Sequence, residues 1–161
     1  MSQNPHLSLI DTLIATYRTL NMSVRPRPEE ELRSRGSGSH GVRDVVQRMR
    51  DDELLFSQAL KERISGVTMP EMFHDERPVI GTEHEGDSTA KLLAQFGTAR
   101  ESTLAMLRSL PDAEWDTAGE GQQTIAARVA SLAENDRKQL ERIARVIPGV
   151  EPAATVSAAT N

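Results

Sequence analysis

The chain has 161 residues, a formal net charge of −5 at pH 7 and no cysteine. This acidic balance argues against a nucleic-acid-binding protein, whose footprint would be a basic patch. The lack of cysteine excludes disulfides, thiolate zinc sites and a cysteine nucleophile, and it is compatible with a cytoplasmic location, which we expect.

The sequence carries no predicted membrane or secretion signal. No run of about 18 apolar residues is present, so we expect no membrane span. The first residues lack the basic, apolar and small-residue order of a secretory leader. Aromatic residues make up only 3% of the chain, so aliphatic side chains must form most of a core between helices. We therefore expect one cytoplasmic domain with its own core.

Apolar residues recur at helical spacing from the beginning of the chain. The first predicted helix covers residues 5–22, with Asn4 as its cap and Pro5 in its first turn. Its apolar stripe consists of Leu9, Leu13, Ile14, Tyr17 and Leu20. Residues 25–28 contain two prolines and end this helix, and residues 29–33 are expected to form one short helical turn.

The second predicted helix covers residues 41–65 and ends at Gly66. Its stripe consists of Val42, Val45, Val46, Met49, Phe56, Leu60 and Ile64. Asp52 and Glu53 interrupt that stripe midway. Residues 66–87 are rich in proline and glycine and are predicted to form a long crossover loop, a feature that is often functional or lid-like.

The third predicted helix covers residues 88–109, capped by Asp87 or Ser88. Its inward residues are Leu92, Leu93, Phe96, Thr103, Leu104 and Leu107, and Arg100 lies near the same face. Residues 110–115 turn the corner toward the last predicted helix, 124–147. The small and polar residues 150–161 are expected to form a disordered tail.

No segment alternates in the manner of a β-strand, and no internal repeat is present. Four long amphipathic helices with one long connection between the middle pair predict an all-α four-helix bundle over residues 1–149.

The last predicted helix has a polar block within its buried stripe. The stripe consists of Ile125, Val129, Leu132, Ile143 and Ile147. Asp136 and Gln139 fall on the same face, and Asn135 lies at its flank. Burying such groups costs free energy unless each finds a partner. The block therefore predicts either a structural polar network or a binding site.

Three fragments resemble the DinB/YfiT-like metalloenzyme superfamily. They are GVRDVVQRMRDDE (41–53), the segment 96–115 with Arg100 and Trp115, and TIAARVASLAENDRKQLERI (124–143). The resemblance implies a four-helix bundle that holds a divalent metal, commonly nickel or zinc, through three histidines. One histidine comes from the second helix, and two come from the last helix at positions i and i+4, where both side chains face one ion.

This chain departs from the family pattern at all three ligand positions, which hold Arg48, Asn135 and Gln139. Arginine stays protonated and cannot be a ligand. Amide oxygens are weak ligands for nickel or zinc. The resemblance therefore implies the fold without the usual metal site, and we expect no metal cofactor.

The residues that remain predict a pocket for a small polar or anionic ligand, formed by Arg48, Glu53, Asn135, Asp136 and Gln139. Two simpler interpretations stay open. The two amides would fill the vacated space and bond to neighbours, and Arg48 would point to solvent. Arg100 and Trp115 match family residues and are expected to be structural, as a carboxylate bridge and a packing anchor.

Three functions are consistent with these observations. The first is a metal-free binding or interaction protein. The second is a metal-dependent enzyme, a thiol-dependent transferase or hydrolase, with unusual ligands from Asp52, Glu53, Asp136, His74 or His84. The third is a structural homodimer without a ligand. The missing histidines favour a non-enzyme over an enzyme.

The family resemblance also implies pairing of two copies through helix faces. Leu54 and Leu55 are apolar positions that the predicted core does not use, and they fit a homodimer interface. We expect no nucleic-acid or membrane partner.

Overall fold

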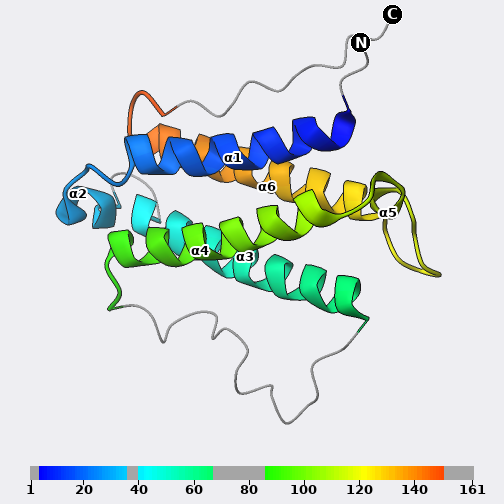
Figure 1. Cartoon of the computed structure of the whole chain (residues 1–161). Coiled ribbons are helices and arrows are strands. Elements are labelled where there is room, and N and C mark those ends of the chain that lie inside the picture. The colour runs from blue at the N-terminus through cyan, green and yellow to red at the C-terminus, as the bar shows by residue number, and fades with distance from the viewer. Residues whose placement is uncertain (1–3, 36–39, 67–85, 151–161) are drawn as a thin grey trace, which may run out of the picture.

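A computed structural model describes residues 4–35, 40–66 and 86–150, and all regular structure in these ranges is helical (Figure 1). The elements are α1 (Pro5–Ser23), α2 (Glu29–Arg33), α3 (Val42–Ser65), α4 (Thr89–Ser109), α5 (Asp112–Trp115) and α6 (Ile125–Val146). The predicted all-α class is thus confirmed for the described residues. The four long helices agree with the predicted ones to within two residues at each end.

The helix ends follow from local side-chain chemistry. The side chains of Asn4, Ser88 and Thr124 each accept a hydrogen bond from a backbone N–H in the first turn of α1, α4 and α6. At the end of α3, Gly66 adopts a left-handed conformation with φ of 66°, which a residue without a side chain adopts at little cost.

The long helices form two parallel pairs. In Figure 1, α3 and α4 run in the same direction, while α1 and α6 run in the opposite one. Helix α3 packs most extensively on α4, and contacts also join α1 to α6, α1 to α4, and α3 to α6. Each long helix therefore has two neighbours. The end of α3 and the beginning of α4 lie at opposite ends of the molecule in Figure 1, and the crossover loop predicted between them falls mostly outside the described residues.

The buried apolar side chains form two clusters, one toward each end of the long helices. The first consists of Leu20, Val24, Leu32, Val42, Val45, Val46, Met49, Leu92, Leu93, Phe96, Leu140, Ile143, Ile147 and Val150. The second consists of Ile10, Leu13, Leu60, Leu104, Leu107, Trp115, Ile125, Val129 and Leu132. Five buried polar residues of α3, α4 and α6 lie between the two clusters in sequence and belong to the site described below: Glu53, Arg100, Thr103, Asp136 and Gln139.

The short helix α2 holds the beginnings of α3 and α4 together. The carboxylate of Glu29 accepts the N–H of Thr89, with both oxygens 3.1 Å from the nitrogen. Arg33 and Arg43 both donate to the carbonyl oxygen of Asp87, at 3.2 and 2.9 Å. A carboxylate at the N-terminal end of α4 also interacts favourably with the helix dipole.

Four details differ from the sequence predictions. Ile64 is 42% exposed, because it lies in the last turn of α3, and Ile10 is buried although it was not in the predicted stripe. Residues 112–115 form the short helix α5 rather than a simple turn. Val150, predicted to begin the tail, is buried in the first cluster. Residues 151–161 lie outside the described ranges.

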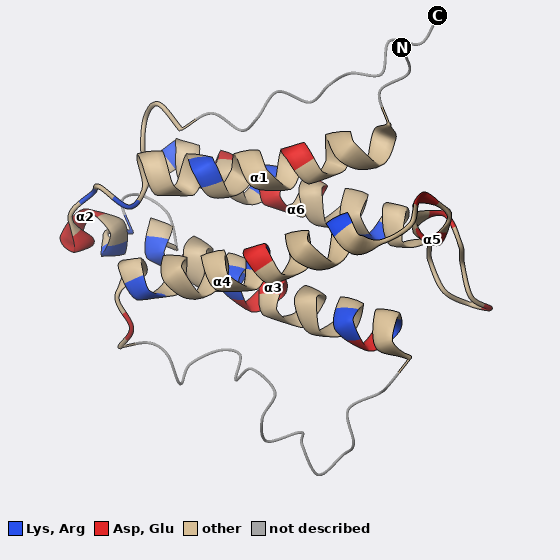
Figure 2. Cartoon of the chain, viewed as in Figure 1, with Lys and Arg blue, Asp and Glu red and all other residues tan. Residues whose placement is uncertain are grey.

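Charges of both signs are distributed along the long helices (Figure 2). Within the described ranges, no helix combines the length and the apolar character that a membrane crossing requires.

Candidate functional site

The centre of the molecule holds a buried ionic triad made of Glu53 from α3, Arg100 from α4 and Asp136 from α6. The Nη2 atom of Arg100 lies 2.7 Å from Oε2 of Glu53, and its Nη1 atom lies 2.9 Å from Oδ2 of Asp136. Nη1 also donates to the carbonyl oxygen of Leu13 in α1, at 3.0 Å. All three charged side chains are at most 3% exposed. Arg100 therefore joins all four long helices.

Neighbouring side chains bond to the two carboxylates of this triad, whereas Nε of Arg100 is buried without a hydrogen-bond partner among the described residues. The hydroxyl of Thr103, three residues after Arg100, donates to Oε1 of Glu53 at 2.8 Å. Thr16 in α1 forms a side-chain hydrogen bond with Asp136. The ring of Phe96 lies 4.8 Å from Cζ of Arg100, within the range of a cation–π contact. A buried ion pair is stable only when such additional bonds accompany it.

The triad has two carboxylates for one cation, and the pKa values of Asp136 and Arg100 reflect this. Burial raises the pKa of the Asp136 carboxyl, Arg100 opposes that shift without cancelling it, and the charge of Glu53 adds to it. Burial by itself would lower the pKa of Arg100, but attraction to Asp136 and Glu53 outweighs it and raises the pKa. Arg100 therefore stays charged, and the ionised form of Asp136 is less favourable in this site than it would be in water.

A second polar network lies one residue away on both α3 and α6. Asn135 donates to Oδ2 of Asp52 at 3.1 Å. Gln139 donates to Oδ1 of Asn135 at 3.3 Å, and Arg142 donates to Oε1 of Gln139 at 3.1 Å. We call these four residues the seam chain, because they follow the line where α6 meets α3. Gln139 is buried, Asp52 and Asn135 are half-buried, and Arg142 is exposed.

The structure divides the predicted pocket into these two networks. Glu53 and Asp136 face Arg100 in the interior, whereas Asn135 and Gln139 belong to the seam chain. Arg48 is exposed, so it does not join the buried carboxylates. The physical reason is that Arg48 lies at the edge of the apolar stripe of α3, and Arg100 supplies the buried positive charge instead.

The residues at the family's three ligand positions do not fit nickel or zinc. The amide oxygens of Asn135 and Gln139 already accept hydrogen bonds from side chains, and the guanidinium of Arg48 offers no lone pair. Within the described part of the chain, no group of three or more histidine, aspartate or glutamate residues is placed to hold a metal ion. His74 and His84 lie outside the described residues.

The carboxylates proposed as unusual ligands are engaged elsewhere. Asp52 accepts from Asn135, and Glu53 and Asp136 pair with Arg100. No metal-dependent step is derived from them.

Two structural predictions are confirmed. Arg100 bridges carboxylates and a helix carbonyl inside the molecule. Trp115 is buried and stacks on His6, with 4.6 Å between ring centroids. Sequence reasoning missed Arg142 and Thr103 as network members. Their spacing was a usable signal, because Arg142 follows Gln139 by three residues and Thr103 follows Arg100 by three.

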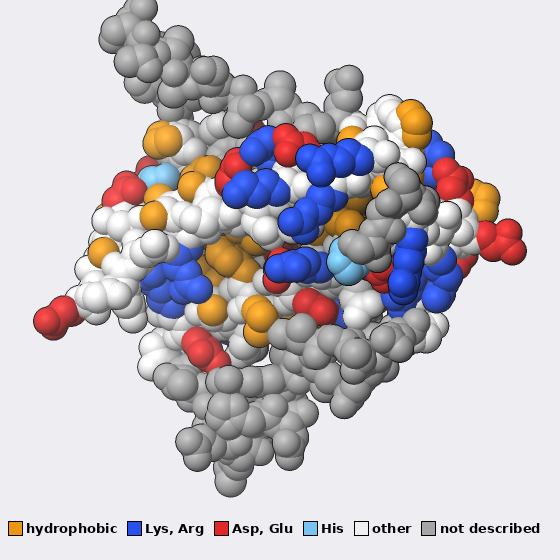
Figure 3. All heavy atoms as spheres, turned by 180° about the vertical axis from the view of Figure 1, so that it is seen from behind, with side chains coloured by type: hydrophobic (Ala, Val, Ile, Leu, Met, Phe, Trp, Pro, Cys, Tyr) orange, Lys and Arg blue, Asp and Glu red, His pale blue; other side chains and the backbone are white. Residues whose placement is uncertain are grey.

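Basic side chains gather on the face that α3 and α6 form, seen from behind in Figure 3. Arg48 on α3 and Arg142 and Arg145 on α6 are exposed. These exposed positive charges contrast with the net charge of −5 of the whole chain.

Comparison of the chain with protein-family models, with curated proteins and with solved structures finds no match. The resemblance to the DinB/YfiT-like superfamily therefore rests on the three sequence fragments.

Proposed function

We propose that this chain is a metal-free member of the DinB-like four-helix-bundle fold that acts by binding a small anionic ligand on the α3–α6 face. The fold proposal is supported by four long helices, each with two neighbours, and by one parallel pair that needs a long connection. The absence of fitting ligands at Arg48, Asn135 and Gln139 supports the metal-free part.

The observation that carries the proposal is the seam chain and its exposed end. Gln139 holds one nitrogen of the Arg142 guanidinium, which leaves the other donors of that group directed to solvent. In the described part of the chain, neither Arg142 nor Arg48 has a carboxylate within 4.0 Å. A positioned guanidinium without a counter-charge is suited to a carboxylate or phosphate group.

The register of the helices brings Arg48 to the same end of this face. Asp52 and Asn135 are bonded across the seam, and α3 and α6 run in opposite directions. Arg48 precedes Asp52 by four residues, and Arg142 follows Asn135 by seven, so both lie toward the same end. Two guanidiniums on one face favour an anion.

Catalysis is not supported by the buried triad. Glu53 and Asp136 have the acidic groups that acid–base chemistry needs, but a substrate has no route to them because their side chains are at most 3% exposed. Both carboxylates bond to Arg100, and Glu53 also accepts from Thr103, so their role is to hold the helices together.

The homodimer remains part of the proposal. Leu55 is 49% exposed and Leu54 is half-buried, so the outer side of α3 offers apolar surface to a second copy. Light scattering on the eluting protein, which gives the mass in solution, tests this.

The function is tested by metal analysis and by thermal unfolding with inorganic phosphate. Tag-free protein purified without chelator should contain no stoichiometric nickel or zinc, and neither ion should stabilise it. Phosphate at about ten times its dissociation constant should stabilise the fold by about 1.4 kcal/mol, which raises Tm by roughly 3–6 °C for a domain of this size.

The matched variants are Arg142→Gln on the seam and Arg108→Gln at an exposed position of α4. The first should abolish the phosphate response, and the second should keep it. Chloride at equal ionic strength separates binding from charge screening. Stoichiometric metal, or an equal phosphate response in both variants, contradicts the proposal.

A further inference from the structure

Three exposed arginines follow one another along the α3–α6 face toward the end of α6, and we call them the arginine row: Arg48, Arg142 and Arg145. The bond of 3.1 Å between Asn135 and Asp52 fixes the level at which the two antiparallel helices meet. At a rise of about 1.5 Å per residue, Arg48 lies about 6 Å from that level, Arg142 about 10.5 Å and Arg145 about 15 Å, all in the same direction. Successive members of the row are therefore about 4.5 Å apart along the helix axes.

The positive charge of the arginine row is not balanced within the described part of the chain. Among those residues, no carboxylate lies within 4.0 Å of any of the three guanidiniums. Gln139 holds one nitrogen of Arg142 at 3.1 Å, whereas Arg48 and Arg145 form no side-chain hydrogen bond or ion pair in the same ranges. Three such cations on one face repel one another, so they favour an anion with several charges over an anion with one.

Acidic residues of α3 and α6 at this end are bonded to other groups. Asp44 accepts the N–H of Gly41 at 3.2 Å, and Glu141 pairs with Arg137. The dipoles of the two helices oppose each other here, because α3 begins at the end of the molecule where α6 ends. The arginine row therefore decides the sign of the local potential.

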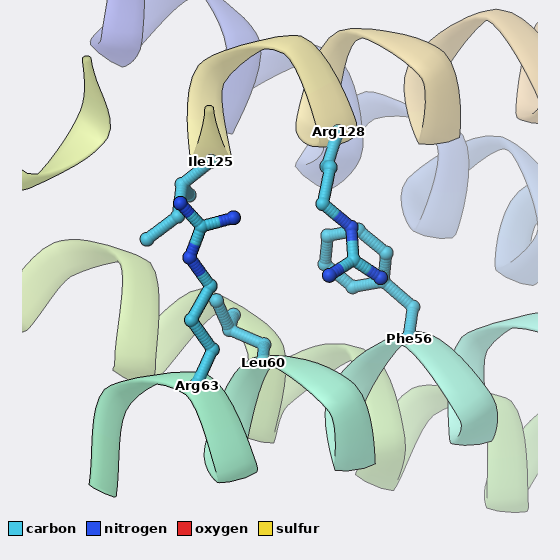
Figure 4. Close-up of a pocket in the computed structure, with 5 residues that line it drawn as sticks. All are labelled: Phe56, Leu60, Arg63, Ile125 and Arg128. Atoms are coloured by element: carbon cyan, nitrogen blue, oxygen red, sulfur yellow. The ribbon is translucent and has the colours of Figure 1, made fainter. Parts of the chain in front are cut away.

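The arginines at the other end of the seam are engaged by the protein itself (Figure 4). The guanidinium of Arg128 lies over the ring of Phe56, 5.9 Å from its centroid. Arg63 donates to the carbonyl oxygens of Gln123 and Thr117, at 2.5 and 3.0 Å. Arg128 is also fourteen residues from Arg142, about 21 Å along α6, so neither side chain belongs to the arginine row.

We infer that the anionic ligand of this face carries a diphosphate group, an inference that rests on the proposed function and names its ligand class. Three guanidiniums in a row form two adjoining anion positions, one between Arg48 and Arg142 and one between Arg142 and Arg145. A planar guanidinium binds two oxygens of a phosphate at once, so each phosphate group is bound by the two arginines beside it.

Two phosphate groups joined through one oxygen atom fill both positions, whereas a single phosphate fills only one. The link makes the second contact intramolecular, so the affinity rises without any new residue. Arg145 is then the residue that selects a diphosphate over a single phosphate.

The test is a titration of the full chain with phosphate and with pyrophosphate, followed through its backbone amide resonances. Divalent cations are left out, and chloride keeps the ionic strength equal. Both anions should shift the resonances of Arg48, Gln139 and Arg142, and pyrophosphate should extend the shifts to Arg145. Pyrophosphate should bind at least about tenfold more tightly than phosphate. Adenosine diphosphate distinguishes two sources of the group: affinity at or above that of pyrophosphate supports a diphosphate ester, and weaker affinity supports free pyrophosphate.

Arg145→Gln should weaken pyrophosphate binding about tenfold and change phosphate binding by less than about twofold, because it removes only the second position. Arg108→Gln removes the same charge from an exposed position of α4 and should leave both affinities unchanged. The amide spectrum shows whether each variant is folded.

Three results would overturn the inference: equal affinity for phosphate and pyrophosphate, pyrophosphate shifts away from the arginine row, or the same pyrophosphate affinity in Arg145→Gln as in Arg108→Gln. In each case a phosphate response that is lost in Arg142→Gln would leave the proposed function standing. If neither anion shifts the resonances of Arg48 and Arg142, the proposed function itself fails, and the inference fails with it.

Discussion

Asp52 and Glu53 are neighbours on α3, and Asn135 and Asp136 are neighbours on α6, yet each pair is divided between two different environments. Glu53 and Asp136 lie in the interior with Arg100, whereas Asp52 and Asn135 lie on the half-buried seam. One residue corresponds to about 100° around a helix, which is enough to turn a side chain from the centre of the molecule to its surface. From sequence, Glu53, Asn135 and Asp136 are predicted to share one pocket.

The two networks therefore have different energetic roles. In the triad, every charge is enclosed, so the loss of one partner leaves an uncompensated charge in a medium that solvates it poorly. In the seam chain, water can replace a lost partner, because three of its four members are half-buried or exposed. Stability should depend on the triad, and ligand recognition should depend on the seam chain.

The largest effect is expected from Arg100→Met. This change removes the cation and leaves Glu53 and Asp136 buried without it, which should lower the free energy of unfolding by about 3–5 kcal/mol. Urea denaturation followed by circular dichroism measures this. Arg108→Met, at an exposed position of the same helix, should change it by less than about 0.5 kcal/mol.

A loss below roughly 1 kcal/mol in Arg100→Met would mean that water reaches both carboxylates. The triad would then resemble the seam chain, and the contrast between interior and surface would disappear.

An intermediate effect is expected in the pH dependence of Asp136→Asn. The pKa of Asp136 is raised in the folded protein above its usual value of 3.8. The folded state then holds this proton more tightly than the unfolded state, so its contribution to stability is fully present below pH 3.8 and is lost as pH rises through the raised pKa. Asparagine has no such proton.

The stability of the native chain relative to Asp136→Asn should therefore fall as pH rises above about 4, with a slope of at most about 1.4 kcal/mol per pH unit. Urea denaturation of both proteins at a series of pH values gives the two curves. Parallel curves would show that Asp136 titrates in the folded protein as it does in the unfolded chain.

The fold elements could be predicted because their signals are local. Asn4, Ser88, Thr124 and Gly66 act through hydrogen bonds or backbone freedom within one turn, so their roles as helix ends can be read from sequence. The burial of Asp136 and Gln139 followed from helical periodicity in the same way. The family resemblance indicated Arg100 as a bridging residue, and the structure bears this out.

The partners of the polar residues could not be predicted, because they depend on the relative rotation of helices that are distant in sequence. The bond of Asp136 to Arg100 spans 36 residues, and that of Glu53 to Arg100 spans 47. The exposure of Arg48 could not be predicted for the same reason. Its position at the edge of a stripe is compatible with burial or exposure, and only the packing of α3 against α6 decides between them.

The smallest effect on stability is expected from Asn135→Ala, and it separates the two networks most directly. Alanine removes the bond to Asp52 and the acceptor for Gln139, each of which is partly solvated and so contributes about 1 kcal/mol or less. Alanine also has a higher helix propensity than asparagine, by at most about 0.7 kcal/mol. These terms oppose each other, so urea denaturation should show a change within about 0.5 kcal/mol.

Phosphate affinity should nevertheless weaken in Asn135→Ala, because Gln139 loses the neighbour that orients it toward Arg142. A stability loss close to that of Arg100→Met, with phosphate affinity unchanged, would instead place the seam chain in the core and remove it from recognition.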